Sequence, residues 1–339
     1  MKQLVLFITF FLMVCCTVTE KEVFTADLRP LTSSMAAKEP LTTITQSIEV
    51  IPLETHDDAL IGYIAQAMVD NQYIYILSRN KCFQFDKKGK YLRTIGTRGK
   101  GPQEYLSIVK MQLNNNIIQF HDYYSSRIVS YDNEGKYLST VQIPPFSFNT
   151  VFRMNEELYV GYIPNARGYE RNRFLWFKEG GSVVDSIPYM QKYNFNTVQF
   201  FLDEGSFSKN GETLYFKEYL NDTIFHVTEN SVHPFLFLEL GDMRARENAR
   251  IETIPNDKTW FSNMARINLL GVSDRYILLT YKGLCIYDKK DKSTKSIDMQ
   301  HNSINFSPSA LSSDGKHLIA WSIGEGDNNP NMLFAKLKE

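Results

Sequence analysis

Residues 85–95 read FDKKGKYLRTI, and residues 131–141 repeat the pattern as YDNEGKYLSTV. The glycines of the two copies, Gly89 and Gly135, lie 46 positions apart. Each copy joins an aromatic strand end to a polar turn containing Asp and Gly, and then to a second apolar strand, which is the pattern of a β-hairpin. Gly adopts the positive φ of such a turn at little steric cost. The sequence therefore predicts an internal β-hairpin repeat.

Two further signals extend and count this repeat. Residues 177–187 (FKEGGSVVDSI) follow at the same offset, and residues 287–297 (YDKKDKSTKSI) form another copy. A polar turn pair also runs into a β-branched or aromatic strand six times, at a mean spacing of about 49 residues, which suits a four-stranded propeller blade. These six predicted strands are residues 73–77, 117–120, 158–160, 214–216, 276–279 and 318–321.

The repeat predicts an all-β fold, namely a six-bladed β-propeller with four-stranded antiparallel blades over residues 41–339. The repeats lack helical apolar spacing, which argues against helical solenoids. We expect the N-terminal strand, residues 44–53, to close the ring beside the C-terminal strand, residues 332–337, because closure removes open sheet edges. Residues 242–254 have a helix-favouring composition and are interpreted as a short helical insertion between the fourth and fifth blades.

The start of the chain has the features of an export signal. Lys2 precedes an apolar run over residues 4–14, which is too short to span a bilayer. Cys15 and Cys16 follow this run, and the junction resembles the lipobox of bacterial lipoproteins, although the residue before the lipidated Cys is normally small. We therefore predict lipidation at Cys16, with Cys15 as the alternative.

This signal sets the expected domain organisation. We expect a lipoprotein signal peptide over residues 1–16, a polar tether over residues 17–40 and the propeller from residue 41 onward. The membrane is then reached by the lipid anchor only. Cys82 and Cys285 remain in the mature chain within apolar strand patterns, which predicts buried thiols rather than a disulfide, metal or redox site.

Charge and composition exclude several classes of partner and fold. The 339 residues include 37 Lys and Arg against 38 Asp and Glu, so the formal net charge is −1. Long-range attraction to polyanions is then weak, and no nucleic-acid partner is expected. Hydrophobic residues make up 43% of the chain, which argues against disorder.

Five stretches carry a family resemblance: IPLE at 51–54, FDKKGK at 85–90, IGTRGKGPQEY at 95–105, SDGKHL at 313–318 and DNNPNML at 327–333. Together they resemble the six-bladed, TolB-like or NHL-like β-propeller lipoproteins of Bacteroides and related bacteria. The resemblance implies the propeller fold, export, and lipid anchoring in the cell envelope, at the periplasmic or surface face of the outer membrane. It implies no particular activity, because one fold serves many functions. Gln103 departs from the family, which usually has Gly at this position.

The segment 96–105 is the strongest local candidate for a ligand site. Its glycines allow backbone N–H groups to approach a ligand, and Arg98 and Glu104 add charge, so it could form an anion nest. The alternative is a turn that only carries the chain from the first blade to the second. Because loops carry a propeller's variable chemistry, and Arg and Tyr often dominate interfaces, we predict ligand binding at one channel mouth. The candidate residues are Arg98, Gln103, Glu104 and Tyr105, extended by Arg244, Arg246 and Arg250 of the insertion.

Catalytic and metal-binding motifs are absent from the sequence. Gly-x-Ser-x-Gly, His-Glu-x-x-His and Asp-x-Asp-x-Asp-Gly do not occur, and the six histidines do not recur at one place in the repeat. His121 follows the strand interpreted as the innermost of the second blade and could reach the channel mouth. The aromatic loops 144–148 and 193–195 either stack on sugars or pack under long loops. We predict no metal site and no cofactor.

Two function hypotheses remain. The first is a non-catalytic, monomeric lipoprotein propeller that binds a protein, peptide or glycan through loops at one channel mouth. The second is a propeller lyase or hydrolase with a metal-assisted site in the central channel, which requires several His, Asp or Glu side chains to converge there. A purely structural role in an envelope complex is a third possibility.

Overall fold

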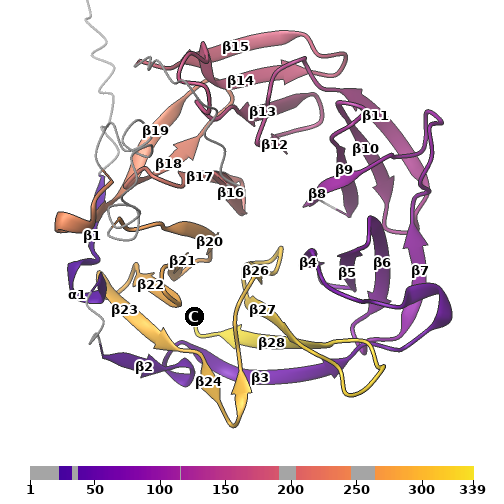
Figure 1. Cartoon of the computed structure of the whole chain (residues 1–339). Coiled ribbons are helices and arrows are strands. Elements are labelled where there is room, and N and C mark those ends of the chain that lie inside the picture. Colours follow the sequence, from indigo (N-terminus) through magenta and orange to yellow (C-terminus); the bar gives the residue numbers. More distant parts are fainter. Residues whose placement is uncertain (1–22, 33–36, 115, 191–203, 246–263) are drawn as a thin grey trace, which may run out of the picture.

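The computed structural model describes residues 23–32, 37–114, 116–190, 204–245 and 264–339. They form a ring of six β-sheets around a central channel (Figure 1). The predicted six-bladed β-propeller with four-stranded antiparallel blades is therefore confirmed. In blades 1 to 5 the chain runs outward from the innermost strand, which borders the channel, whereas the outermost strand of blade 6 comes from the N-terminal part of the chain.

The strands of the first three blades follow one another along the chain. Blade 1 holds β4 (Gln66–Val69), β5 (Tyr73–Ser78), β6 (Lys81–Asp86) and β7 (Tyr91–Ile95). Blade 2 holds β8 (Ile108–Asn114), β9 (Ile117–Asp122), β10 (Arg127–Asp132) and β11 (Tyr137–Gln142). Blade 3 holds β12 (Thr150–Arg153), β13 (Leu158–Tyr162), β14 (Asn172–Lys178) and β15 (Val183–Pro188).

Blades 4 and 5 are built in the same way, and blade 6 takes its outermost strand from the N-terminal segment. Blade 4 holds β16 (Gly205–Asn210), β17 (Thr213–Glu218), β18 (Thr223–Val227) and β19 (Val232–Glu239). Blade 5 holds β20 (Asn268–Val272), β21 (Tyr276–Thr280), β22 (Leu284–Asp288) and β23 (Ser293–Asp298). Blade 6 holds β26 (Ala310–Leu311), β27 (His317–Ser322), β28 (Asn331–Leu337) and β3 (Thr45–Pro52). A short hairpin of β24 (Gln300–His301) and β25 (Ile304–Asn305) connects blades 5 and 6.

All six strands counted from the sequence are second strands of their blades, namely β5, β9, β13, β17, β21 and β27. They are buried by neighbouring blades on both sides, which explains their apolar composition. One assignment was wrong. The strand at 117–120 is not the innermost of blade 2, because β8 lies between it and the channel.

Ring closure follows the prediction. The N-terminal strand β3 pairs antiparallel with the C-terminal strand β28, with Pro52 opposite Asn331 and Ser47 opposite Lys336. Figure 1 shows the purple strand β3 beside the yellow strand β28 in this blade. The last blade is thus completed by a strand from the opposite end of the sequence.

The folded part begins earlier than residue 41, so the expected tether over 17–40 needs correction. Strand β1 (Phe24–Asp27) pairs in parallel with β19, and β2 (Lys38–Pro40) pairs in parallel with β23. Together with helix α1 (Arg29–Thr32), these strands form a belt along the outer edges of blades 4 and 5 (Figure 1).

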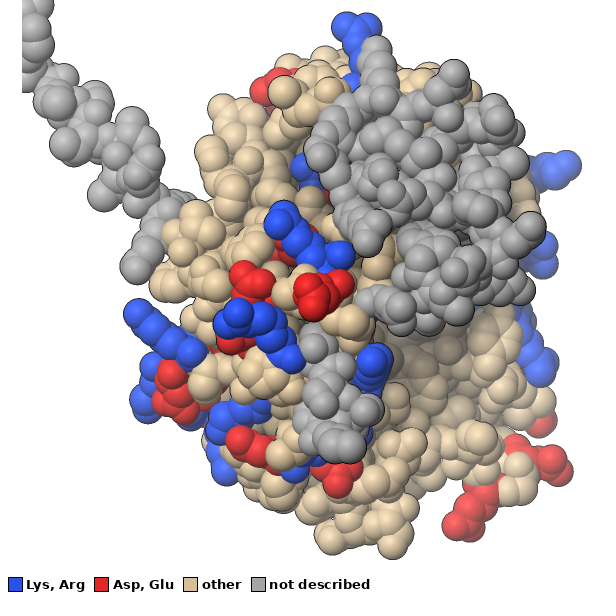
Figure 2. Space-filling model, turned by 60° about the vertical axis from the view of Figure 1, so that its left-hand side comes forward, with Lys and Arg blue, Asp and Glu red and all other residues tan. Residues whose placement is uncertain are grey.

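Apolar burial and ion pairs hold this belt. Ala26 and Leu28 are buried, because their side chains join the core between blades 4 and 5. The Lys295 ammonium lies 3.2 Å from the Glu39 carboxylate. Figure 2, which brings this side of the ring forward, shows basic and acidic side chains interspersed.

The hairpin repeat corresponds to the turn between the third and outermost strands. Gly89, Gly135 and Gly181 occupy this turn in blades 1, 2 and 3, and all have φ between 79° and 84°. The Asp before each of the first two turns accepts backbone N–H groups, as Asp86 does from Lys88 and Lys90. The predicted positive φ is therefore confirmed, and the Asp side chains cap the turns.

Six apolar clusters between neighbouring blades form the core, and aromatic side chains dominate several of them. Cys82 and Cys285 are free thiols buried in two of these clusters, as predicted. Three 3-10 turns complete the elements: η1 (Leu41–Thr43), η2 (Asp57–Ala59) and η3 (Gly241–Met243). Apart from η3 and the residues to 245, the helical insertion expected over 242–254 lies outside the described residues.

Candidate functional site

The two faces of the ring differ in the connections that they carry. One face carries the turns between second and third strands and the connections that lead into each next blade. The other carries the turns between first and second strands and those between third and outermost strands. We call the first the tyrosine face and the second the polar face, for the side chains described next.

Exposed large apolar side chains in loops gather on the tyrosine face. The turn after β9 exposes Tyr123 and Tyr124, whose rings pack edge to face. The turn after β13 exposes Tyr169, and the turn after β27 exposes Ile323. The complete set on this face among the described residues is Leu60, Tyr63, Tyr123, Tyr124, Phe146, Tyr169, Met190 and Ile323.

The polar face has no exposed large apolar side chain in the described part of its turns. Its polar side chains instead link neighbouring blades. The Asn210 amide donates to the Asp274 carboxylate at 3.0 Å, and the Asn155 amide donates to Glu229 at 2.7 Å. These side chains are therefore used within the ring, and the exposed apolar side chains make the tyrosine face the better candidate for a partner.

The predicted loop 96–105 lies against the outer strands of blade 2 rather than at the channel. Arg127 donates to the carbonyl oxygen of Glu104 at 2.7 Å, and the Tyr131 hydroxyl donates to that of Gln103 at 2.6 Å. The four candidate residues are not among the described residues that line the channel. The predicted position at a channel mouth is therefore wrong.

The Glu104 carboxylate occupies the place where an anion was expected to bind. The Glu104 carboxylate accepts the backbone N–H of Gly101 at 2.7 Å and lies so close to Gly99 that a Cβ there would come within 2.0 Å of it. Tyr105 is 1% exposed and packs edge to face on Phe120, and burial raises the pKa of its hydroxyl. Tyr105 is thus part of the framework between blades 1 and 2.

The other candidate residues are exposed, held in an ion pair, or outside the described residues. Arg98 and Gln103 are exposed, and their role in binding stays a prediction. Arg244 pairs with the Asp222 carboxylate at 2.5 Å, beside the turn after β17. Arg246 and Arg250 lie outside the described residues, as does the aromatic loop 193–195. In the other aromatic loop, Phe146 is exposed and Phe148 packs over Gly161.

The channel has a volume of about 760 Å³, and both polar and apolar side chains line it. Its amides bridge neighbouring innermost strands, since Gln66 on β4 exchanges two hydrogen bonds with the backbone of Met111 on β8. Its charged side chains are of both signs, namely Lys110 and Lys209 against Asp70 and Glu212. No group of three or more His, Cys, Asp or Glu that could hold a metal occurs within the described ranges.

His121 and Asp122 belong to the framework of blade 2. Burial lowers the pKa of His121 to about 4, with the nearby Lys110 as a second cause, so its imidazole is neutral at pH 7. The Asp122 carboxylate accepts the backbone N–H groups of Leu106 and Ser107 at 3.0 Å each. The Asp122 carboxylate therefore anchors the connection from blade 1.

A family model described as a domain of unknown function, DUF4934, matches residues 30–331. The chain belongs to the DUF4934 family. The match includes the end of the N-terminal belt and the blades up to the start of β28. The TolB-like, NHL-like and lipoprotein parts of the expected resemblance stay predictions. No curated protein matches this DUF4934 chain.

Two solved structures share the fold of this DUF4934 protein. A candidate exported protein of Bacteroides fragilis is 16% identical, with a TM-score of 0.68 over 94% of this chain and 100% of that one. A member of the DUF4221 family from Bacteroides vulgatus is 11% identical, with a TM-score of 0.50 over 87% of this chain and 97% of that one. Within the described residues, none of the helices has the length and hydrophobicity needed to cross a membrane.

Proposed function

We propose that this DUF4934 protein is an exported, lipid-anchored, non-catalytic binding module that docks a protein of the cell envelope on its tyrosine face. The uneven distribution of exposed apolar side chains between the two faces carries the proposal. Eight lie in loops of the tyrosine face, and none lies in the described turns of the polar face. Apolar groups that cluster on one side mark an interaction surface, whereas scattered ones need no explanation.

The chemistry of this face favours a protein partner. Met190 and Ile323 are 94% and 92% exposed, so almost their whole side chains are in water. Aliphatic tips of this kind gain from burial against other apolar side chains but offer no flat ring for a sugar. Tyr124 is 77% exposed and combines a large apolar ring with a hydroxyl, as interface residues often do.

Export and anchoring are supported by the N-terminal signal pattern and by the candidate exported protein of the same fold. The belt places residue 24 at the outer edge of blade 4, so the anchor would join the ring at its rim. Both faces then stay accessible.

Capture from solubilised envelope tests the proposal. Three proteins are immobilised: the mature protein and two triple variants of it. The first variant changes the tyrosine face (Tyr124→Ser, Tyr169→Ser, Ile323→Ser). The second is a matched control on outer strands (Leu92→Ser, Leu138→Ser, Val184→Ser). We expect the first triple variant to capture at least about tenfold less partner protein than the wild type, because a few apolar anchors dominate most interfaces. The matched variant should capture as the wild type does, and both should keep their melting temperatures.

Equal capture by the tyrosine-face variant would contradict the proposal. Capture that resists protease but is lost after glycosidase treatment of the envelope would show that the partner is a glycan and would also contradict it.

A further inference from the structure

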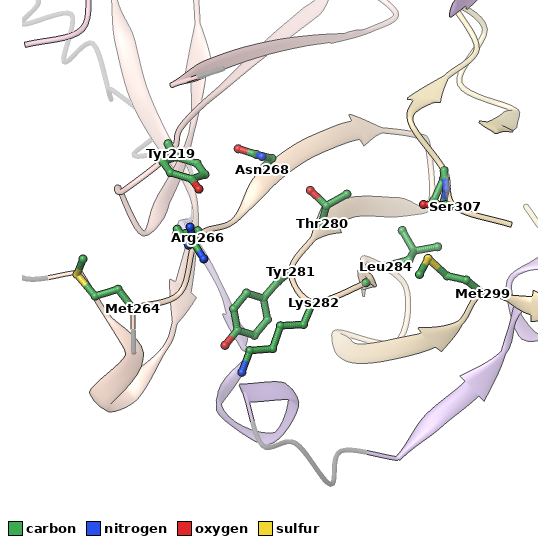
Figure 3. Close-up of a pocket in the computed structure, with 12 residues that line it drawn as sticks. Tyr219, Met264, Arg266, Asn268, Thr280, Tyr281, Lys282, Leu284, Met299 and Ser307 are labelled. Carbon is green, nitrogen blue, oxygen red and sulfur yellow. The ribbon is translucent and has the colours of Figure 1, made fainter. Parts of the chain in front are cut away.

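A second hollow on the tyrosine face lies where blades 4, 5 and 6 meet. Its volume is about 420 Å³, which is in the range of small-molecule sites. It is separate from the exposed tyrosines and from the channel, with which it shares no lining residue. Figure 3 shows that its residues come from the turn after β17, the start of β20, the turn between β21 and β22, and the connection to blade 6.

Two basic side chains, Arg266 and Lys282, line this hollow, and no Asp or Glu does so among the described residues. Asn268, Thr280 and Ser307 add neutral hydrogen-bonding groups around the same space (Figure 3). In a chain with a net charge of −1, such a lining favours a ligand that carries negative charge.

Tyr281 gives an independent indication of a ligand. It lines the hollow and is only 7% exposed, yet its hydroxyl has no hydrogen-bond partner within the described part of the protein. A buried hydroxyl without a partner is destabilising, because it has lost water and gained nothing in return. An oxygen atom of a ligand would satisfy it.

The turn between β21 and β22 places the Lys282 ammonium over the Tyr281 ring. The Lys282 Nζ lies 5.3 Å from the centre of the Tyr281 ring. Lys282 has a φ of +49° and Gly283 one of +132°, so the backbone is in the left-handed region at both positions. Figure 3 shows that the side chains of Lys282 and Tyr281 extend from the turn in the same direction.

The other wall of the hollow is apolar. Met264 and Leu284 are buried side chains of the lining, and Met299 and Pro308 extend this surface. Inorganic anions gain nothing from thioether and aliphatic groups, whereas an organic acid can place its carboxylate on the cations and its body on this wall.

From this arrangement we infer that the hollow binds a small organic acid, with its carboxylate between Arg266, Lys282 and the Tyr281 hydroxyl and its apolar body against Met264, Leu284 and Met299. The inference goes beyond the proposed docking of a protein and does not depend on it, because the two sites share no residue.

The test uses calorimetry on the mature protein with phenylacetate and octanoate as probes. The neutral probes 2-phenylethanol and octanol have the same bodies, and inorganic phosphate has charge without a body. We expect saturable binding of at least one carboxylate, and binding at least about tenfold weaker for its neutral analogue, because charge-assisted hydrogen bonds are lost. Equal binding of both members of each pair, equally tight binding of phosphate, or no binding of either carboxylate would overturn the inference.

Variants locate the site. Lys282→Gln and Arg266→Gln should each weaken carboxylate binding about tenfold, whereas Lys290→Gln, an exposed lysine on the polar face of the same blade, should leave it unchanged. Tyr281→Phe should weaken binding while keeping or raising the melting temperature of the ligand-free protein, because it removes an unpartnered hydroxyl. Wild-type affinity in all three site variants, or an equal loss in Lys290→Gln, would overturn the assignment.

Discussion

Gly89, in the outer turn of blade 1, packs directly on Pro52, the last residue of the strand that closes the ring. A Cβ at Gly89 would lie 2.1 Å from the Pro52 carbonyl oxygen, and the Gly89 carbonyl accepts the backbone N–H of Glu54 at 2.8 Å. The glycine of the sequence repeat therefore forms the turn in blade 1 and also contacts the outermost strand of blade 6.

Gly89→Ala should destabilise the protein by more than about 2 kcal/mol, because it adds a steric clash to the strain of a positive φ. Gly180→Ala is the matched control, since Gly180 has a φ of +86° but a Cβ there would meet nothing within 4 Å. Its cost should stay near about 1 kcal/mol. Urea unfolding measures both values, and equal losses of stability would show that the contact with Pro52 is unimportant.

Removal of the N-terminal belt should weaken the ring. A chain that begins at residue 41 loses β1, β2 and the buried Leu28, and we expect its free energy of unfolding to fall by at least about 2 kcal/mol. A chain that begins at residue 23 keeps the belt and serves as the control. Identical unfolding curves for the two chains would mean that the belt adds nothing to stability.

Lys217 should make stability depend on pH. Burial lowers the pKa of its ammonium to about 7, and its Nζ donates to the backbone carbonyl of Glu218 at 2.6 Å. Between pH 7 and the ordinary lysine pKa near 10.5, the unfolded chain binds a proton that the folded chain does not, so stability rises with pH in this window.

The comparison of Lys217→Met with the wild type isolates this effect. The difference in unfolding free energy between pH 7.5 and 9.5 should be smaller in the variant, by up to about 1.4 kcal/mol for each pH unit. Lys316→Met, at an exposed lysine, should keep the wild-type slope. The same slope in both variants would show that Lys217 titrates normally in the folded protein.

Lipidation is tested by metabolic labelling with a fatty acid. We expect Cys16→Ala to abolish the label and Cys15→Ala to retain it, because Cys16 is the predicted N-terminal residue of the mature chain. Label that persists in the double variant would exclude a lipid anchor at these positions.

The sequence predicts strands best where burial on both sides makes them apolar. All six second strands were found in this way, with β5 and β21 almost wholly buried. The innermost strands gave a weaker signal, because each borders the channel, which polar as well as apolar side chains line. Strand β16, which reads GSFSKN, is an example.

Long-range pairing explains the elements that sequence reasoning missed. Strands β1 and β2 are short and polar, and their partners β19 and β23 lie more than 200 residues away in the chain. No local pattern therefore separates them from a tether. Likewise, Tyr105 is of a residue type that is common at binding sites, but only the packing of blades 1 and 2 shows that it is buried. The adjacent Tyr123 and Tyr124, in a turn between two strands, were the available signal for the tyrosine face.

The most direct test of the central claim, that the tyrosine face docks a protein, is site-specific photo-crosslinking in the native envelope. A photoreactive amino acid is placed at Tyr124, Tyr169 or Ile323 on this face, and at the exposed Lys88, Glu134 or Lys290 on the polar face. The account predicts discrete protein adducts from the first three positions and none from the other three. Adducts from the polar face alone, or equally from both faces, would contradict it.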